Sequence, residues 1–305
     1  MNFAITGVGG FVAPRHLAAI ASVGGRVVAA LDPHDSVGVL DAHGYGIEFF
    51  SDEGRFSKHL EELRDGPEAT RLRYLTVCAP NHVHEAQCRM GLERGVDVIC
   101  EKPVVLEPSE LDRLEGIESA TGRRVWTVLQ LRGHDRLRAL RARLADRGPH
   151  EVVLTYVTPR GPWYEHSWKA DVERSGGLAT NIGIHMFDLL SWLFGPLVRS
   201  ELHLRERRRM AGYFEHERAR VTWFLSIAHE DVAPGGRMQR SLVIDAEPID
   251  LVDEGGMLHR RVYEEVLAGH GLGLADARSC ILTASALRTM ETTTKRERVH
   301  PRLRP

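Results

Sequence analysis

The chain has 305 residues, a formal net charge of −2, 43% hydrophobic residues and 27% charged residues. These values are typical of a soluble globular protein that is long enough for two domains. The balanced charge excludes a general attraction to nucleic acid or to anionic lipid, so we expect neither partner. The basic run at residues 205–209 lacks interleaved aromatic residues and is interpreted as a solvated surface face.

The cysteines and the N-terminus indicate a compartment. None of Cys78, Cys88, Cys100 and Cys280 forms a Cys-x-x-Cys pair or a Cys/His spacing typical of zinc. We therefore expect no metal site and a reducing, cytoplasmic environment. No apolar run approaches the length of a membrane span, and we identify no signal peptide before the first strand.

The first 131 residues alternate between apolar strands and helices. Strands are predicted at residues 2–6, 27–31, 74–78, 96–100 and 125–129, with helices between them that include 84–93 and 109–121. This alternation is typical of a parallel, doubly wound sheet with helices on both faces. We therefore predict an α/β fold with a Rossmann domain at residues 1–131.

Residues 132–305 follow a different pattern. Strands are predicted at 151–158, 201–204, 218–227 and 241–244, and helices at 136–145, 185–193, 263–268 and 275–294. Strands with few helices between them predict an α+β domain with a mainly antiparallel, open sheet. Such a sheet usually hides one face against a partner, so we expect a homo-oligomer, a dimer or a tetramer. The charged tail, residues 295–305, is expected to be loose.

A glycine-rich turn, Gly7-Val8-Gly9-Gly10, joins the first predicted strand to a helix. Gly7 and Gly9 fit the fingerprint Gly-x-Gly-x-x-Gly, but its third position falls on Val12. The spacing Gly7, Gly10 and Ala13 fits as well, and both alternatives stay open. Either supplies the small residues that let a pyrophosphate approach the N-terminus of a helix.

Asp32 lies 22 positions after Gly10, at the end of the second predicted strand. A carboxylate in that place hydrogen-bonds the adenosine ribose and repels a 2′-phosphate, so the expected cofactor is NAD rather than NADP. The alternative is a turn residue before Pro33.

Two residues are candidates for proton transfer. Lys102 follows the strand at 96–100, and ligands bind at the carboxyl ends of strands in open α/β sheets. His185 opens a helix within Gly176–Asp188, and Asp188, three residues further on, shares its helix face and is placed to orient it. The alternatives are a surface lysine, a core histidine and a surface carboxylate.

On these motifs the sequence resembles the glucose–fructose oxidoreductase/inositol dehydrogenase family (Gfo/Idh/MocA). The resemblance covers nearly the whole chain and rests on the glycine turn, Ala79–His84, Glu101-Lys102-Pro103 and Gly176–Asp188. It implies that Lys102 is catalytic and that His185 is the other partner of the reacting hydroxyl. It also implies a cofactor site formed by Gly7, Gly9, Gly10, Phe11, Val12, Asp32, Cys78, Pro80, Asn81, His84, Glu101, Lys102 and Gln130.

The sequence is still more similar to bacterial UDP-N-acetylglucosaminuronate 3-dehydrogenases of the WlbA/WbpB type. This similarity rests on residues 7–16, 29–38, 130–132, 167–169 and 181–185. It implies NAD-dependent oxidation of the C3 hydroxyl of a UDP-linked N-acetylglucosaminuronic acid to a 3-keto sugar. That product feeds a transaminase that makes diamino sugars for polysaccharides such as the O-antigen.

The chemistry of this reaction assigns further roles. Oxidation of an alcohol needs a base within hydrogen-bond reach, either Lys102 or His185, and the sequence leaves this choice open. A uronate carboxylate needs cationic partners, first Lys169 and then Arg160. The full set expected to bind substrate is Arg15, Arg160, Trp168, Lys169, Asn181 and His185. The alternative functions are a dehydrogenase or reductase of another sugar or an inositol, and an NAD-binding protein without turnover.

Overall fold

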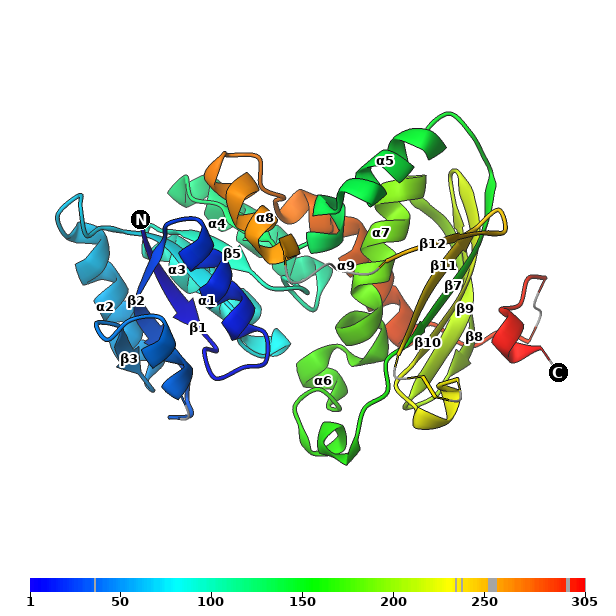
Figure 1. Ribbon diagram of the computed structural model, residues 1–305, viewed down its shortest axis with the longest axis horizontal. Helices are drawn as coiled ribbons and strands as arrows, with labels where there is room; N and C mark the ends of the chain where they lie inside the picture. The colour runs from blue at the N-terminus through cyan, green and yellow to red at the C-terminus, as the bar shows by residue number, and fades with distance from the viewer. Residues whose placement is uncertain (36, 234, 237, 252–256, 295–296, 305) are drawn as a thin grey trace. The chain divides into compact units, whose positions relative to one another are not determined.

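The computed structural model describes residues 1–305 except 36, 234, 237, 252–256, 295–296 and 305 (Figure 1). It divides into two compact units. Unit 1 comprises Met1–Gly133 and Glu254–Arg278, and unit 2 comprises His134–Asp253 and Ser279–Pro305. The first division lies two residues from the predicted domain boundary. Residues 257–278, which the sequence placed in the second domain, instead cluster with unit 1.

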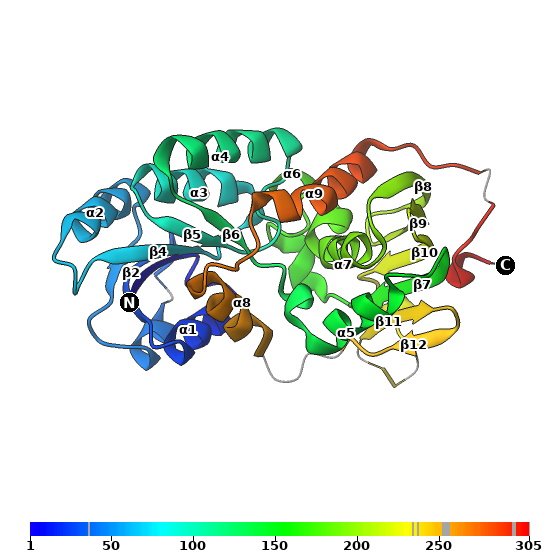
Figure 2. The same ribbon diagram turned by 90° about the horizontal axis from the view of Figure 1, so that it is seen from above.

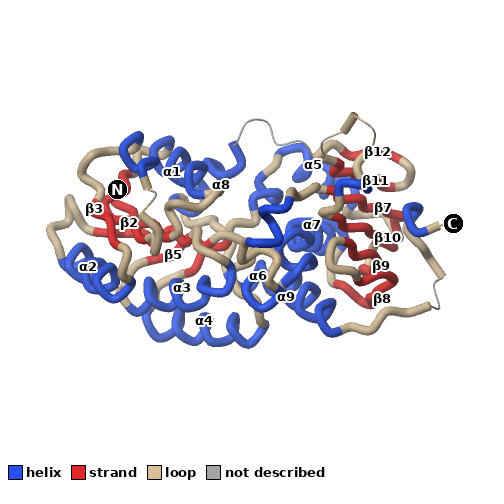
Figure 3. Tube along the Cα trace, turned by 90° about the horizontal axis from the view of Figure 1, so that it is seen from below, coloured by secondary structure: helices blue, strands red, loops and turns tan. Residues whose placement is uncertain are grey.

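Unit 1 contains a six-stranded sheet in the order β3-β2-β1-β4-β5-β6, and every pairing is parallel. Figures 2 and 3 show helices α1 and α8 on one face of this sheet and α2, α3 and α4 on the other. This arrangement confirms the predicted doubly wound sheet. The elements are β1 (Asn2–Thr6), α1 (Ala13–Ser22), β2 (Arg26–Leu31), η1 (Gly38–Ala42), β3 (Glu48–Phe50), α2 (Glu53–Asp65), β4 (Leu72–Val77), η2 (Asn81–Val83), α3 (His84–Glu93), β5 (Asp97–Cys100), α4 (Pro108–Thr121), β6 (Val125–Thr127), η3 (Gln130–Gly133) and α8 (Met257–Leu267).

Helices on both faces explain why the central strands are apolar throughout. All five residues of β1 are buried, so its sequence shows no alternation of polar and apolar residues. The residues of β3 and α2 were not predicted to form a strand and a helix. The reason is a weak signal, because β3 has only three residues and α2 buries only Phe56 and Leu60.

The register of the sheet places the expected motifs at one edge. Thr6 at the end of β1 pairs with Val77 of β4, and Val77 pairs with Cys100 of β5. The residues that follow these three strands are therefore neighbours. They begin the glycine turn, the loop 78–81 and the Glu101-Lys102 segment.

Unit 2 contains a second six-stranded sheet in the order β12-β11-β7-β10-β9-β8. Only the β7–β10 pairing is parallel, which confirms a mainly antiparallel sheet. Helices α7 and α9 lie on one face of this sheet, and the C-terminal turn η7 lies on the other (Figure 1). The elements are α5 (Asp135–Leu144), β7 (His150–Val157), η4 (Pro162–His166), α6 (Val172–Ser175), η5 (Ala179–Gly183), α7 (Ile184–Phe194), β8 (Leu197–Arg205), β9 (Arg209–His216), β10 (Ala219–Ser226), η6 (His229–Asp231), β11 (Gln239–Ile244), β12 (Glu247–Ile249), α9 (Leu274–Thr289) and η7 (Pro301–Leu303).

The expectation of a loose C-terminal tail is wrong for its described residues. His300 is 1% exposed, its Nε2 lies 3.0 Å from Thr155 Oγ1, and its ring stacks on Phe224. A buried aromatic contact holds the tail against the sheet of unit 2. Among the helices of the described residues, none has the length and apolar character needed to cross a membrane.

Candidate active site

The glycine turn after β1 is shaped by close backbone contacts. Gly7 has φ +70°, its amide donates to Leu31 O at 2.8 Å, and the Gly10 amide donates to Gly7 O at 2.9 Å. Helix α1 then begins at the buried Ala13, with no acidic residue in its first turn. An anion at this helix N-terminus is favoured by the helix dipole, so the turn fits a pyrophosphate.

Asp32 lies at the end of β2, beside the glycine turn. Its carboxylate accepts a hydrogen bond from the Gly9 amide at 2.9 Å and another from the His34 amide at 3.0 Å. Asp32 thus forms the turn that was its alternative interpretation, and it also stands at the position expected for a ribose ligand. The two roles are compatible because each carboxylate oxygen accepts more than one hydrogen bond.

Phe11 and Arg15 flank the start of α1. The Phe11 ring is 81% exposed, and the Arg15 guanidinium lies 5.3 Å from its centre. Val12 precedes the first residue of α1 and is partly buried. Phe11 and Val12 were expected to contact the cofactor and Arg15 the substrate. The structure brings Phe11 and Arg15 together on an open surface.

Four residues that were expected to bind the cofactor follow β4, namely Cys78 and Pro80 in the loop, Asn81 at the start of η2 and His84 at the start of α3. Burial raises the pKa of the Cys78 thiol well above its usual range. His84 Nδ1 lies 2.6 Å from Pro103 O, and His84 Nε2 lies 2.7 Å from Ala79 O. Both ring nitrogens are thus engaged within the protein, and the ring joins this loop to the segment after Lys102.

The protonation state of His84 is set by opposing effects. Carbonyl oxygens only accept, so two hydrogen bonds from this ring require protons on both nitrogens. Burial lowers the His84 pKa and outweighs the two carbonyls, which raise it. At neutral pH one of the two short contacts is therefore made by a nitrogen without a proton.

Gln130 supplies an acceptor that the protein leaves unused. Its Oε1 is buried and has no hydrogen-bond partner among the described residues. A buried acceptor of this kind fits a ligand that brings an N–H donor, such as a carboxamide. The contact between Gln130 and the cofactor stays a prediction.

Glu101 directly follows β5 and is 5% exposed. Its Oε1 lies 2.9 Å from His16 Nε2 and 3.3 Å from His259 Nε2, and its Oε2 accepts the Lys102 amide at 3.1 Å. Burial would raise the Glu101 pKa, but the two histidines lower it well below its usual range. Glu101 is therefore an anion at neutral pH, directly before the partly buried Lys102.

His16 and His259 were not predicted as neighbours of Glu101. His16 lies within the motif at residues 7–16, where no local pattern shows which residue it faces. His16, Glu101 and His259 are residue types that bind metals, and their ligand atoms lie within 4.8 Å of one another. The 2.9 Å distance between His16 Nε2 and Glu101 Oε1 is typical of a charge-assisted hydrogen bond. The expected absence of a metal stays a prediction.

In unit 2, His185 is the second residue of α7 and follows the π-helical turn η5. Single π-helical turns are frequent at functional sites. His185 is partly buried, and Asp188, one turn further along, is 2% exposed. The helix thus places both on one side, and the orienting role of Asp188 stays a prediction.

Four polar residues of unit 2 lie near one another, namely Arg160, Tyr164, Lys169 and Asn181. Asn181 Nδ2 donates to Tyr164 Oη at 3.1 Å. The Lys169 ammonium lies 5.0 Å from the centre of the Trp168 ring and 5.6 Å from that of Trp163. Burial, and then the charge of Arg160, lowers the Lys169 pKa.

Arg160 and Lys169 are therefore two neighbouring cations. Within the described part of the chain, neither forms an ion pair with a carboxylate. Lys169 and Tyr164 line a cavity of about 140 Å³. This group fits an anionic ligand, and it unites the expected substrate residues Arg160, Trp168, Lys169 and Asn181.

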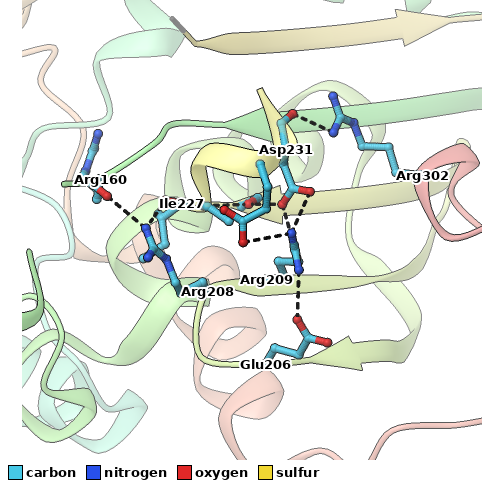
Figure 4. Close-up of polar contacts among 10 residues, drawn as sticks. Arg160, Glu206, Arg208, Arg209, Ile227, Asp231 and Arg302 are labelled. Carbon is cyan, nitrogen blue, oxygen red and sulfur yellow. Dashed lines mark hydrogen bonds and ion pairs between the residues drawn. The ribbon is translucent and has the colours of Figure 1, made fainter. Parts of the chain in front are cut away.

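Arg208 fixes the backbone beside this cation pair (Figure 4). Its guanidinium donates to Arg160 O at 3.0 Å and to Ile227 O at 3.1 Å. Arg209 forms two hydrogen bonds with Asp231, at 2.6 and 3.1 Å. The interpretation of residues 205–209 as a solvated face is thus wrong for these two arginines, which hold strand ends and loops in place.

Comparisons with known proteins identify the family of the chain. Residues 1–128 match the model of an oxidoreductase family with an NAD-binding Rossmann fold (Gfo/Idh/MocA). Residues 149–233 match the C-terminal alpha/beta domain of the same family.

The chain is also similar to a solved structure, the WlbA (WbpB) dehydrogenase from Thermus thermophilus in complex with NAD and alpha-ketoglutarate. The two are 48% identical with a TM-score of 0.95, over 99% of this chain and 100% of that chain. A complex of the Thermus enzyme with NAD and UDP-GlcNAcA has a TM-score of 0.94, with the same identity and coverage.

A curated relative is the putative UDP-kanosamine synthase oxidoreductase subunit of Amycolatopsis mediterranei. It is 32% identical over 123 residues, which are 39% of this chain and 34% of the relative. The chain thus spans about a third of the length of this relative.

Proposed function

Because the chain belongs to the Gfo/Idh/MocA oxidoreductase family and carries its NAD-binding Rossmann domain, we propose that it oxidises the C3 hydroxyl of a UDP-linked N-acetylglucosaminuronic acid. One observation carries this proposal, namely the similarity over nearly the full length to an enzyme crystallised with NAD and UDP-GlcNAcA. The neighbouring cations Arg160 and Lys169 support it because they suit the carboxylate of a uronate.

The proposed reaction separates a hydride from a proton. NAD⁺, which the glycine turn and Asp32 would hold, would supply the acceptor for the hydride from C3 of the sugar. The O3 proton passes to Lys102 or His185 while the C3–O bond becomes a carbonyl. Lys102 is the preferred base or alkoxide partner, because it lies at the strand ends where the glycine turn and Asp32 also lie. Asp188 orients His185, and Gln130 accepts a hydrogen bond from the cofactor amide.

In this proposal Lys169 and Arg160 bind the carboxylate at C6. Burial beside another cation lowers the Lys169 pKa, and an incoming carboxylate would raise it again. Binding of a uronate would thus relieve repulsion between two like charges. A neutral hexose offers no such gain, so the pair favours the acid over the parent sugar.

The test compares two UDP sugars in an assay of NADH formation. UDP-N-acetylglucosaminuronate should be oxidised and UDP-N-acetylglucosamine should react poorly. Lys169→Met should raise KM for the uronate about tenfold to a hundredfold, since a lost hydrogen bond to a charged group costs about 1.5–3 kcal/mol. Lys58→Met, at an exposed lysine of α2, is the matched control. Equal turnover of the two sugars would refute the uronate assignment.

The proposal extends to the setting of the enzyme. A 3-keto sugar is a substrate for transamination, which supports a role in diamino-sugar and lipopolysaccharide biosynthesis. The four cysteines are buried and are not joined in disulfides, as suits a reducing cytoplasm. The open sheet of unit 2 supports a homo-oligomer, a dimer or a tetramer. Sedimentation of the purified protein tests the assembly, and a monomer at micromolar concentration would refute it.

A further inference from the structure

A chain of buried hydrogen bonds runs from the interior of unit 1 to the residue before Lys102. Thr76 Oγ1 lies 3.0 Å from Tyr263 Oη, and Tyr263 Oη lies 2.9 Å from His16 Nδ1. His16 Nε2 in turn lies 2.9 Å from Glu101 Oε1. Thr76, His16 and Tyr263 are all 0% exposed. Water therefore does not reach these groups, and their hydrogen bonds depend on one another.

The direction of each hydrogen bond follows from the charge of Glu101. An ionised carboxylate only accepts, so His16 must carry its proton on Nε2. Burial lowers the His16 pKa despite the opposing effect of Glu101, so the ring is neutral and its Nδ1 is an acceptor. Tyr263 therefore donates to Nδ1, and Thr76 donates to Tyr263. The Thr76 hydroxyl thus orients the Tyr263 hydroxyl, which in turn orients the His16 ring.

His259 meets the same carboxylate oxygen from α8. Its Nε2 lies 3.3 Å from Glu101 Oε1, and its Nδ1 is buried without a hydrogen-bond partner among the described residues. A proton on His259 Nε2 accounts for both observations, because the N–H then points at the Glu101 carboxylate and no proton is left on the unpartnered Nδ1. Glu101 thus receives two imidazole N–H groups on Oε1 and the Lys102 amide on Oε2.

Helix α8 belongs to unit 1 although it lies far from the rest of that unit in the sequence. It comes from residues 257–267, after most of unit 2 in the sequence, yet it packs on α1 in unit 1. It supplies both His259 and Tyr263. The return of the chain thus completes the hydrogen bonds around Glu101, in addition to burying apolar surface.

We propose that His16, His259 and Tyr263 are positioning residues that fix Glu101, and through its bond to the Lys102 amide fix Lys102 for proton transfer. This inference rests on the proposed role of Lys102. Glu101 selects the Nε2–H tautomer of His16, and Tyr263 reinforces it by donating to Nδ1. Without that hydroxyl, the buried Nδ1 acceptor is left unsatisfied, so the preference for Nε2–H weakens and the ring can turn away from the carboxylate.

The test is Tyr263→Phe, which removes a single hydroxyl and keeps the ring. We expect kcat to fall about tenfold to a hundredfold, the scale of a catalytic group misplaced by less than about 1 Å. The Kd for NAD should stay within about twofold. His259→Gln, which keeps an N–H donor, should retain more activity than His259→Leu. Tyr74→Phe is the matched control, because Tyr74 belongs to the same unit and stacks on Phe3.

A second readout does not depend on turnover. Nitrogen-15 spectra of histidine-labelled protein report which ring nitrogen carries the proton. We expect the Nε2–H tautomer at His16 in the unmodified protein and a mixture in Tyr263→Phe. Unchanged kcat and unchanged tautomer in Tyr263→Phe would overturn the inference, as would one equivalent of tightly bound metal at His16, Glu101 and His259. If the unmodified protein oxidises no UDP sugar, the proposed function fails. The nitrogen-15 spectra then still test whether Tyr263 holds the His16 tautomer.

Discussion

A Cβ atom on Gly7 would lie 2.5 Å from the amide nitrogen of Ala79. This closeness follows from the pairing of β1 with β4, which brings the residues after both strands side by side. Gly7 also has φ +70°, a conformation that costs other residues about 1–2 kcal/mol. Two independent constraints therefore require glycine at the start of the turn.

Gly7→Ala should destabilise unit 1 by more than the conformational cost alone and should abolish detectable binding of NAD. Gly24→Ala is the matched control, since Gly24 has φ +72° and a Cβ atom there would meet nothing within 4 Å. We expect Gly24→Ala to cost about 1–2 kcal/mol and to leave binding intact. Thermal unfolding and calorimetric titration measure both effects. Equal losses in the two variants would contradict a steric role for Ala79.

Asp32→Ala should narrow the preference for NAD over NADP, because the carboxylate that repels a 2′-phosphate is removed. Titration of both cofactors into both proteins measures the ratio of the two Kd values. Asp35→Ala, at an exposed carboxylate of the same loop, should leave that ratio unchanged. If the unmodified protein binds the two cofactors equally, Asp32 does not select between them.

Lys102→Met should lower kcat by about 10²–10⁴-fold, the usual contribution of acid–base catalysis. NAD should still bind, because the glycine turn lies on a different strand end. His185→Asn should also reduce turnover, and the pH–rate profile of each variant should reveal which residue titrates as the base. A Lys102→Met enzyme with nearly normal kcat would show that the central catalytic assignment is wrong.

Stability should depend on pH through His300. Burial, and then the charge of Arg302, lowers the His300 pKa to about 4, whereas an unfolded histidine titrates near 6.5. Between these values the unfolded chain binds the extra proton, so His300 makes stability fall as the pH drops from about 6.5 to about 4. Above pH 6.5 the ring is neutral in both states and contributes no pH dependence.

The variant His300→Gln isolates this effect. The loss between pH 6.5 and pH 4 should approach about 3 kcal/mol, at about 1.4 kcal/mol for each pKa unit. Unfolding midpoints of the unmodified protein and the variant, compared at pH 7.5 and pH 4.5, measure it. The difference between the two proteins should shrink at the lower pH. A constant difference would mean that His300 titrates normally in the folded state.

Much of the site was predictable because strand ends are visible in the sequence. Gly7, Asp32, Cys78 and Glu101 each follow or end an apolar run, and the carboxyl ends of parallel strands meet at one edge. The cation pair was partly predictable, since Arg160 and Lys169 are nine residues apart in one connecting segment. Short elements such as β3 and β12, with three residues each, gave too little periodicity to detect.

The sequence by itself determined the alternation of strands and helices in the first 131 residues and the order of the motifs along them. Those features depend on local periodicity and on glycine and proline positions, which neighbouring residues encode. Only the tertiary structure decided that α8 returns to unit 1 and brings His259 and Tyr263 to Glu101. It also decided that Arg208 holds the backbone at Arg160. These contacts join residues 48 to 247 positions apart, and such distant partners are selected by packing and desolvation in the folded chain, not by any short pattern.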